Sequence, residues 1–297
     1  MPEALSADAR IIPVLFGQPF GGSVHSVFAA AVNFTGPAGD LYTLAAAGKS
    51  DAPATVRVAV NAFDRYGLQP GDAVTAAAGS LICGPLVIAS GALRPWTAVL
   101  PAFPADAAGR QRLAGNLAAL RRLVTTDGKV GGLWAFGSGR PGRTMLAREL
   151  ALRAGALRTC LLAARPDEAL AAGCRLLGLG IGLTPAGDDF LTGLILTFRL
   201  AGAPFGKEYH RLAAGLVCEA VTATGLISRS MLRHAADGWA AADLIGLAAA
   251  LTNAGETEVL AAAGRLLANG ATSGTDLAVG LATGLDLGLQ LAKEVNS

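Results

Sequence analysis

Two stretches of the chain repeat one arrangement of glycine and aspartate. A glycine precedes an aspartate by two positions and a second glycine follows it by four, in Gly187-Asp188-Asp189-Phe190-Leu191-Thr192-Gly193 and again in Gly274-Thr275-Asp276-Leu277-Ala278-Val279-Gly280. Glycine, threonine and aspartate are common at helix N-termini, where side-chain oxygens accept hydrogen bonds from free backbone NH groups. Each stretch is therefore either an ordinary helix start or a place where acidic and hydroxyl groups bind a ligand, and we expect the chemistry of the chain here.

A glycine-rich run leads into the first stretch. Gly178-Leu179-Gly180-Ile181-Gly182 is followed by Leu183 and the pair Thr184-Pro185. The run follows a predicted helix rather than a strand, and no Gly-Lys-Ser/Thr comes after it, so neither common nucleotide motif is present. Backbone NH groups of such a loop can converge on a small anion, and the positive end of the next helix adds to the attraction. We predict that Gly180, Gly182 and Gly187 bind substrate, with Thr184 as N-cap and Pro185 as the first helical residue.

The two adjacent aspartates are candidate catalytic residues and candidate metal ligands. On a helix, Asp188 and Asp189 point about 100° apart, so one carboxylate can bind a ligand while the other caps or orients. Mg²⁺ prefers oxygen ligands and commonly takes one or two of them from the protein. Two carboxylates beside a phosphate would repel it without a cation. We therefore predict Mg²⁺ as a possible cofactor held by Asp188 and Asp189.

Other residues add weaker candidates. Thr272, Ser273 and Gly274 precede Asp276 and form a second hydroxyl-rich helix start, and the two helix starts can face one cleft that binds a small anionic substrate. Ser228 lies in a segment that either binds an anion or simply begins a solvated helix. His25 lies in a predicted strand whose alternation puts it on the opposite face from Ser26, where it is either a proton carrier or a structural histidine.

Composition narrows the class of protein. The 297 residues carry a net charge of +2, with lysine and arginine dispersed, which does not suit nucleic acid as a partner. Charged residues are only 15% and there are 39 glycines, which favours tight packing and an oligomer. Glycine and proline interrupt the longest uncharged run, Ala73 to Leu93, so we expect no membrane association. The first twenty residues do not read as a secretory signal, and we expect a cytoplasmic protein.

The periodicity predicts an α+β protein: an N-terminal antiparallel β-rich domain over residues 1–103, followed by a mostly helical C-terminal domain over 104–297. We expect Arg94 to Ala105, with its three prolines, to be a linker or a crossing segment. Predicted strands lie in the segments Val24–Phe34, Leu41–Ala46, Ala54–Val60, Ala73–Ala78 and Leu86–Ala89. Predicted helices are Ala107–Val124, Thr144–Ala154, Asp167–Leu177, Asp188–Leu200, Lys207–Thr222, Ala240–Leu251, Glu256–Leu267 and Thr275–Lys293.

These motifs together resemble a known family. The glycine-rich Leu-Thr-Pro-x-Gly-Asp-Asp block within residues 178–193 is its most specific part, and segments at 24–28, 227–228 and 271–276 follow the same order and spacing. The chain resembles the AllH-like family, long known as a domain of unknown function. One departure concerns Ala186, where many relatives have serine, so a phosphate-binding hydroxyl of those relatives would be missing here.

The resemblance implies a function. It implies a subunit of oxamate carbamoyltransferase, which in purine (allantoin) catabolism converts oxalurate and phosphate to oxamate and carbamoyl phosphate together with other protein subunits. A different class of answer is a non-catalytic assembly or ligand-sensing subunit, which the alanine- and glycine-rich helices and the low charge would suit. A third is a stand-alone Mg²⁺-dependent enzyme that acts on another phosphorylated or amide substrate. Family membership alone does not decide among these functions.

Overall fold

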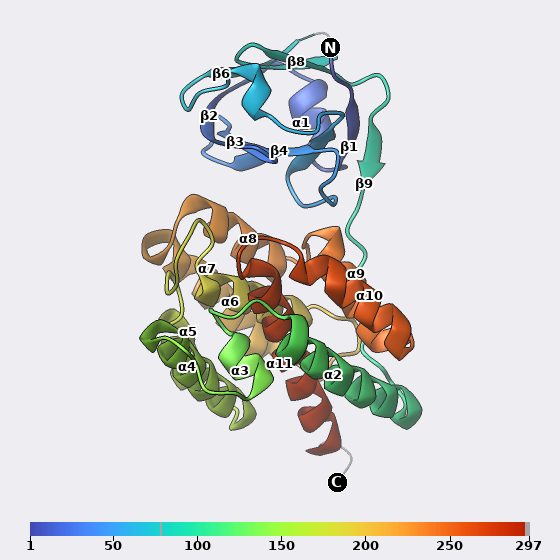
Figure 1. Ribbon diagram of the computed structural model, residues 1–297, viewed down its shortest axis with the longest axis vertical. Coiled ribbons are helices and arrows are strands. Elements are labelled where there is room, and N and C mark those ends of the chain that lie inside the picture. Colours follow the sequence, from blue (N-terminus) through green and yellow to red (C-terminus); the bar gives the residue numbers. More distant parts are fainter. Residues whose placement is uncertain (78, 295–297) are drawn as a thin grey trace. The chain divides into compact units, whose positions relative to one another are not determined.

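The structure is a computed structural model that describes residues 1–77 and 79–294. The chain divides into two compact units, Met1–Ala98 and Val99–Ser297, and each is described by itself (Figure 1). The first unit is rich in strands and the second is helical, which confirms the predicted α+β fold class. The division falls after Ala98, whereas the sequence placed a domain boundary after residue 103, and that domain assignment stays a prediction.

The described residues of the first unit form one nine-stranded sheet in the order β8-β7-β6-β2-β3-β4-β5-β1-β9. Two short helical segments accompany it, α1 (Ile12–Phe16) and the 3₁₀ helix η1 (Asp64–Tyr66). The strands are β1 (Ala4–Asp8), β2 (Phe20–Phe28), β3 (Ala31–Thr35), β4 (Leu41–Ala46), β5 (Thr55–Val58), β6 (Ala73–Ala77), β7 (Ser80–Cys83), β8 (Leu86–Ala89) and β9 (Arg94–Trp96).

Most neighbouring strands pair antiparallel, as predicted, but two pairs do not. β4 pairs parallel with β5, and β1 pairs parallel with β9. A parallel bridge between Glu3 and Ala89 also links the start of β1 to the end of β8, so the sheet curls into a half-barrel. The strands curve around α1 (Figure 1). The enclosed core is formed by apolar residues such as Phe34, Leu44 and Phe63, all fully buried.

Two details of the strand unit differ from the sequence-based expectation, and a third cannot be compared. The apolar segment Val24–Phe34 is a hairpin of β2 and β3 rather than one strand, because the chain turns between Phe28 and Ala31. Arg94–Trp96 is strand β9 rather than linker, and its proline is tolerated because β9 lies at the sheet edge. Ala78, which we placed at the end of a predicted strand, lies outside the described residues.

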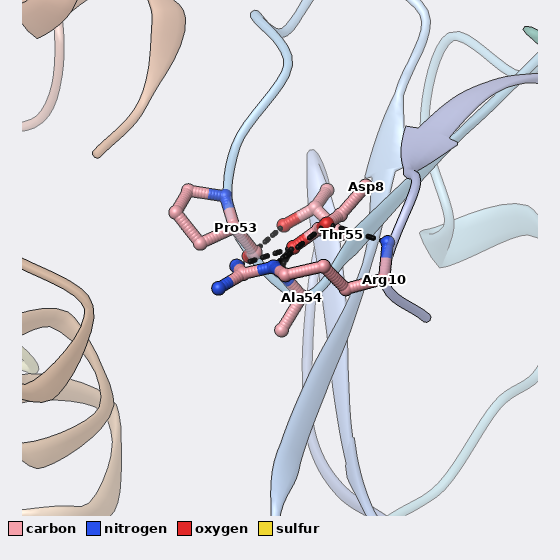
Figure 2. Close-up of polar contacts among 5 residues, drawn as sticks. All are labelled: Asp8, Arg10, Pro53, Ala54 and Thr55. Atoms are coloured by element: carbon pink, nitrogen blue, oxygen red, sulfur yellow. Dashed lines mark hydrogen bonds and ion pairs between the residues drawn. The ribbon is translucent and has the colours of Figure 1, made fainter. Parts of the chain in front are cut away.

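A buried carboxylate anchors one edge of this unit. Asp8 accepts hydrogen bonds from the backbone NH and the guanidinium of Arg10, and from the backbone NH of Ala54 at 2.8 Å (Figure 2). Ala54 has φ +51, a backbone conformation that non-glycine residues rarely adopt. Burial alone would raise the pKa of Asp8, but the bonds from Arg10 and Ala54 outweigh it and hold that pKa below its usual value. Asp8 therefore stabilises an unusual turn as a charged group.

The second unit is a bundle of helices. Its elements are α2 (Ala107–Asp127), α3 (Trp134–Ser138), α4 (Met145–Leu162), α5 (Pro166–Cys174), α6 (Ala186–Thr197), α7 (Lys207–Ala223), α8 (Leu226–Ala236), α9 (Ala242–Asn253), α10 (Glu256–Leu267) and α11 (Ser273–Glu294). The predicted bounds of α10 are exact. The five-residue α3 was not predicted. No helix within residues 1–77 and 79–294 has the length and apolar character needed to cross a membrane.

Helix α6 is the centre of this bundle. Every residue from Ala186 to Thr197 is buried, including both aspartates, and α6 packs most closely on α11 and α8. Figure 1 shows α6 in the interior, with other helices around it. A helix surrounded on all sides must be apolar on all sides. Polar side chains kept within it need partners from neighbouring segments, and these partners build the candidate site.

Candidate functional site

The glycine-rich loop before α6 depends on backbone angles that glycine adopts easily. Gly178, Gly180 and Gly182 have φ of +69°, +145° and +106°. A side chain on Gly178 would overlap the carbonyl oxygen of Ala223, and one on Gly180 would overlap the backbone nitrogen of Ala186. The first two glycines therefore permit close backbone contacts, while the tip of the loop is exposed. Ile181 at that tip is 86% exposed.

Helix α6 begins one residue after Pro185, the predicted first helical residue, and two residues before the predicted helical range Asp188–Leu200. Its N-cap is Pro185, with φ −53° and ψ 143°, and Ala186 is the first helical residue. Thr184 is not the N-cap because its hydroxyl donates to Oδ2 of Asp189 at 3.1 Å. Asp188 and Asp189 lie in the first turn, where the positive end of the helix dipole favours negative charge.

Asp188 accepts hydrogen bonds from two different segments. Its Oδ1 accepts from the backbone NH of Gly178 at 2.8 Å, and its Oδ2 accepts from the hydroxyl of Thr224, just before α8. Burial is the largest effect and raises the pKa of Asp188, while Thr224, Gly178 and the nearby hydroxyl of Ser228 lower it. Oγ of Ser228, in the first turn of α8, is itself buried and has no hydrogen-bond partner. Asp188 thus ties the glycine-rich loop to the connection between α7 and α8.

Asp189 points to a different group of residues. Thr184 donates to Oδ2, and Ser273 at the start of α11 also lowers its pKa, but Oδ1 has no hydrogen-bond partner although it is buried. Burial is the largest effect and raises the pKa of Asp189 well above its usual value, and the nearby charge of Asp276 raises it further. The two adjacent aspartates therefore diverge, as their helical positions predict.

Asp276 occupies the equivalent place in α11. Its Oδ1 accepts from the backbone NH of Leu133 at 2.6 Å, and the hydroxyl of Thr272 also lowers its pKa. Its Oδ2 is buried without a partner. Burial raises the pKa of Asp276 to about 7. Asp189 and Asp276 thus share one pattern: one oxygen is bound by protein donors and the other is not.

Helices α6 and α11 run in the same direction, so their N-termini meet. At one end, the hydroxyls of Thr184 and Ser273 are 3.1 Å apart. At the other, a side chain on Gly284 would overlap the hydroxyl of Thr197. The positive ends of two helix dipoles therefore converge on Asp189 and Asp276. The hydroxyls are half-buried and the carboxylates are buried, so an incoming ligand would meet the hydroxyls first.

The other residues at the start of α11 also lie where the N-termini of α6 and α11 meet. Gly274 is buried in the first turn of α11, and a side chain there would overlap the carbonyl oxygen of Leu266. Thr275 is fully buried, and its hydroxyl accepts from the backbone NH of Lys129 at 3.0 Å. The structure thus brings together Thr184, Asp189, Thr272, Ser273, Gly274 and Asp276. Whether they bind substrate stays a prediction.

A second loop, which sequence reasoning missed, completes this group. Residues 129–133 bring Lys129 and Leu133 to the start of α11. Gly132 has φ +43, and a side chain there would overlap Oδ1 of Asp276. The exposed Nζ of Lys129 donates to the carbonyl oxygen of Gly270 at 2.5 Å. The run Asp127-Gly-Lys-Val-Gly-Gly132 was a signal for such a loop, but its partner lies more than 140 residues further along the chain.

His25 lies in β2 of the strand unit and is exposed. The pairing of β2 with β3 shifts register between Val24 and Ser26, and Nδ1 of His25 lies 3.1 Å from Oγ of Ser26. The expected alternation of these side chains onto opposite faces is therefore wrong, because a bulge at this position redirects His25. The structure does not place His25 relative to the helical unit, and its catalytic role stays a prediction.

No group of three or more histidine, cysteine, aspartate or glutamate side chains is arranged to hold a metal ion in the part of the chain that the structure describes. The predicted ligands Asp188 and Asp189 also differ in availability. Asp188 has protein donors on both oxygens, whereas Asp189 has one oxygen without a partner. A cation at this site would therefore rely on few protein oxygens, which is common for Mg²⁺.

Comparison with known families gives two matches. Residues 3–94 match the AllH family N-terminal domain, and residues 176–285 match a family model described as oxamate carbamoyltransferase subunit AllH. The first match covers most of the strand unit. The second begins just before Gly178 and ends within α11, so it includes both aspartate motifs. The search of solved structures found no match for the chain.

Proposed function

The chain belongs to the AllH family, and from this membership we propose that it works as a subunit of an oxamate carbamoyltransferase, in partnership with other enzyme subunits. The proposed reaction is the phosphorolysis of oxalurate in allantoin catabolism. Phosphate oxygen attacks the ureido carbonyl carbon, the bond from that carbon to the oxamate nitrogen breaks, and the nitrogen takes up a proton. The products are carbamoyl phosphate and oxamate.

The observation that carries this proposal is the convergence of two helix N-termini at half-buried hydroxyls. Phosphate, oxalurate, oxamate and carbamoyl phosphate are all small anions, and backbone NH groups at helix N-termini bind such anions. Thr184 and Ser273 place two hydroxyl groups 3.1 Å apart at this point. Both can donate to an anion, because a hydroxyl rotates to suit its acceptor. Ala186 adds no hydroxyl to this site, so its side-chain donors come from Thr184, Thr272 and Ser273.

In the proposed mechanism, the protein supplies position and charge. NH groups of the Gly178–Gly187 segment, apart from those of Gly178, Leu179 and Gly187 that donate within the protein, hold phosphate or carboxylate together with the two hydroxyls. Asp189 holds a cation or orients the amide nitrogen that leaves. Fixed donors aimed at oxygens where negative charge develops stabilise the transition state, usually the largest single contribution to catalysis.

Anion binding tests this function directly. We would titrate phosphate, oxamate and carbamoyl phosphate into the full chain by calorimetry and compare wild type with the double variant Thr184→Val, Ser273→Ala. Thr126→Val is the matched control, because Thr126 is exposed on α2 and its hydroxyl bonds only within that helix. Binding that the double variant weakens and the control preserves would support the proposal. Unchanged binding in the double variant would reject the hydroxyl site.

One observation favours the alternative of a non-catalytic assembly subunit. Ile181 is 86% exposed and Leu183 is 56% exposed, and both lie in the glycine-rich loop. Exposed apolar side chains together in one loop suit a protein contact. The variant Ile181→Ser, Leu183→Ser in the assembled enzyme tests this alternative. An assembly role would be favoured over the proposed anion site by two results together. The variant would fail to assemble with the other subunits, and the wild-type chain would bind none of the three anions, either alone or in the complex.

A further inference from the structure

The three aspartates at the start of α6 and α11 differ in what their oxygens contact. Asp188 is saturated by donors from the glycine-rich loop and from the start of α8. Oδ1 of Asp189 and Oδ2 of Asp276 are buried and accept no hydrogen bond. Asp189 is 1% exposed and Asp276 is 0% exposed, so solvent does not satisfy these oxygens. The unsatisfied oxygens therefore belong to a pair that is distant in sequence, not to the adjacent pair.

Unsatisfied carboxylate oxygens are costly in a protein interior. A buried polar atom without a partner forfeits its hydration, and the loss is larger for a charged group. Native proteins keep such atoms mainly where a bound ion, a water molecule or a functional role accounts for them. Here two of them belong to neighbouring carboxylates, each fixed through its other oxygen by Thr184 or by the NH of Leu133. Their positions are therefore prepared by the fold rather than accidental.

A divalent cation is the occupant that fits both oxygens. An anion alone beside two carboxylates would be repelled, whereas a cation is attracted by both of them. Mg²⁺ takes hard oxygen ligands, commonly one or two carboxylates, and keeps water or a substrate phosphate in its remaining positions. The lack of a third acidic ligand among the described residues suits such an open site. The half-buried hydroxyls of Thr184, Thr272 and Ser273 surround it with further oxygens.

We propose that Asp189 and Asp276 together form a divalent-cation site between the N-termini of α6 and α11, and that Asp188 is a positioning residue that fixes the glycine-rich loop. This site stands on the contacts of the two aspartates alone. Its further role, to let a substrate phosphate bind beside the carboxylates, rests on the proposed function. The assignment differs from the adjacent pair Asp188 and Asp189 that the sequence predicted.

Mn²⁺ binding to the full chain, followed by electron paramagnetic resonance in buffer free of phosphate and other substrate anions, tests the site. We expect one Mn²⁺ per chain, displaced by Mg²⁺. Asp189→Asn and Asp276→Asn should each weaken binding by about tenfold or more, because each removes one of two charges. Asp188→Asn should keep the affinity within about threefold but lower the melting temperature, since an amide nitrogen replaces one of the two oxygens that accept hydrogen bonds.

Asp243→Asn is the matched control, because Asp243 is an aspartate in the first turn of another helix, α9, and accepts from Asn269. It should leave Mn²⁺ binding unchanged. Circular dichroism checks that each isosteric variant is folded, and a rise in the melting temperature of wild type with Mg²⁺ gives a second readout. The proposal is overturned if wild type binds no Mn²⁺, or if Asp189→Asn and Asp276→Asn both bind as well as wild type. Loss of binding in folded Asp188→Asn would return the site to the adjacent pair.

The cation site and the anion site can be tested independently of each other. Anion titrations without a divalent cation, and cation titrations without an anion, show which half of the site is wrong. Mn²⁺ binding without any binding of phosphate, oxamate or carbamoyl phosphate would keep the cation site and reject the proposed substrates. Anion binding that is unaffected by Mg²⁺ and by both aspartate variants would keep the anion site and reject the cation.

Discussion

Gly193 of α6 and Gly280 of α11 lie at equivalent points of one helix crossing. A side chain on Gly193 would overlap the carbonyl oxygen of Leu277, and one on Gly280 would overlap that of Phe190. The positions differ by the same 87 residues that separate the two aspartate motifs, so each helix makes the same contact with the other. The repeated glycines are thus explained by packing, and the repeated aspartates that precede them are brought to a common place.

This crossing predicts that alanine at either glycine is destabilising. Alanine normally favours a helix interior over glycine by about 1 kcal/mol, but here the added carbon must displace the backbone of the partner helix. We expect Gly193→Ala and Gly280→Ala each to lower the free energy of unfolding of the helical unit by about 1–3 kcal/mol, the usual range for overpacking. Urea denaturation followed by the helical circular dichroism signal measures this change.

The control for the crossing is Gly264→Ala. Gly264 lies within α10, is exposed, and has open space where a side chain would be. This substitution should stabilise the unit by about 0.5–1 kcal/mol through helix propensity. If all three variants shift stability in the same direction, the contact between the two helices does not explain the glycines.

Local sequence patterns predicted most of the strands and helices of this fold but missed β9 and α3. α10 and the strands β4 and β8 were found with their exact bounds, because turn residues delimit them on both sides. β9 was missed because its proline is acceptable only at the edge of a sheet, and an edge position is a property of the whole sheet. The five-residue α3 is too short for helical periodicity to show.

In the candidate site, too, local motifs predicted some features, and contacts between distant segments determine the others. The motifs placed Asp189 and Asp276 at two helix starts, which is local information. Their difference from Asp188 comes from Gly178, Thr224 and Leu133, which reach the aspartates from other segments. Hydrogen bonds between distant segments leave no periodic signal, so the sequence alone could not separate the anchoring carboxylate from those with a free oxygen.

Asp8 predicts a pH-dependent contribution to the strand unit. Its pKa is lowered in the folded chain by Arg10 and Ala54 despite burial, so its stabilising effect is present above the unfolded value near 3.8 and is lost as pH falls through the folded value. We expect Asp8→Asn to destabilise the unit by about 2 kcal/mol at pH 7, since hydrogen bonds to a charged group are strong. Thermal melts of both proteins between pH 7 and pH 2 should show the difference shrinking at the acid end.

Asp64→Asn is the control for this series. Asp64 is exposed in the short helix η1, and its substitution should change the melting temperature little at any pH. A difference between wild type and Asp8→Asn that stays constant from pH 7 to pH 2 would show that charge on Asp8 contributes nothing.

The contacts of Asp188 predict that truncating its side chain causes a large loss of stability. Asp188→Ala leaves the part-buried NH of Gly178 and the part-buried hydroxyl of Thr224 without their acceptor, and each unsatisfied donor costs about 1–3 kcal/mol when water does not replace the acceptor. We therefore expect a loss of at least about 2 kcal/mol, measured by urea denaturation. Asp106→Ala is the comparison, because Asp106 is the N-cap of α2 and accepts from Gly109 only at the helix start. It should cost about 1 kcal/mol. Equal losses would mean that Asp188 is an ordinary cap.

The contact of Gly132 with Asp276 predicts that the loop of residues 129–133 positions this carboxylate. Alanine at this position would overlap Oδ1 of Asp276 and would have to keep φ at +43, so the hydrogen bond from the NH of Leu133 should break and Asp276 should move. We expect Gly132→Ala to lose stability by about 1–3 kcal/mol, from the positive φ and the clash together. We also expect it to lose Mn²⁺ and anion binding, measured by the titrations described above.

Gly139→Ala separates these two causes. Gly139 also has a positive φ, +69, but a side chain there would meet open space at the end of α3. This control should carry only the backbone cost, about 1 kcal/mol, and should bind ligands as wild type does. Because the two variants share the backbone strain and differ in the contact with Asp276, a binding defect in Gly132→Ala alone assigns the defect to that contact. Equal binding in both variants would show that the loop supports the fold without positioning the carboxylate.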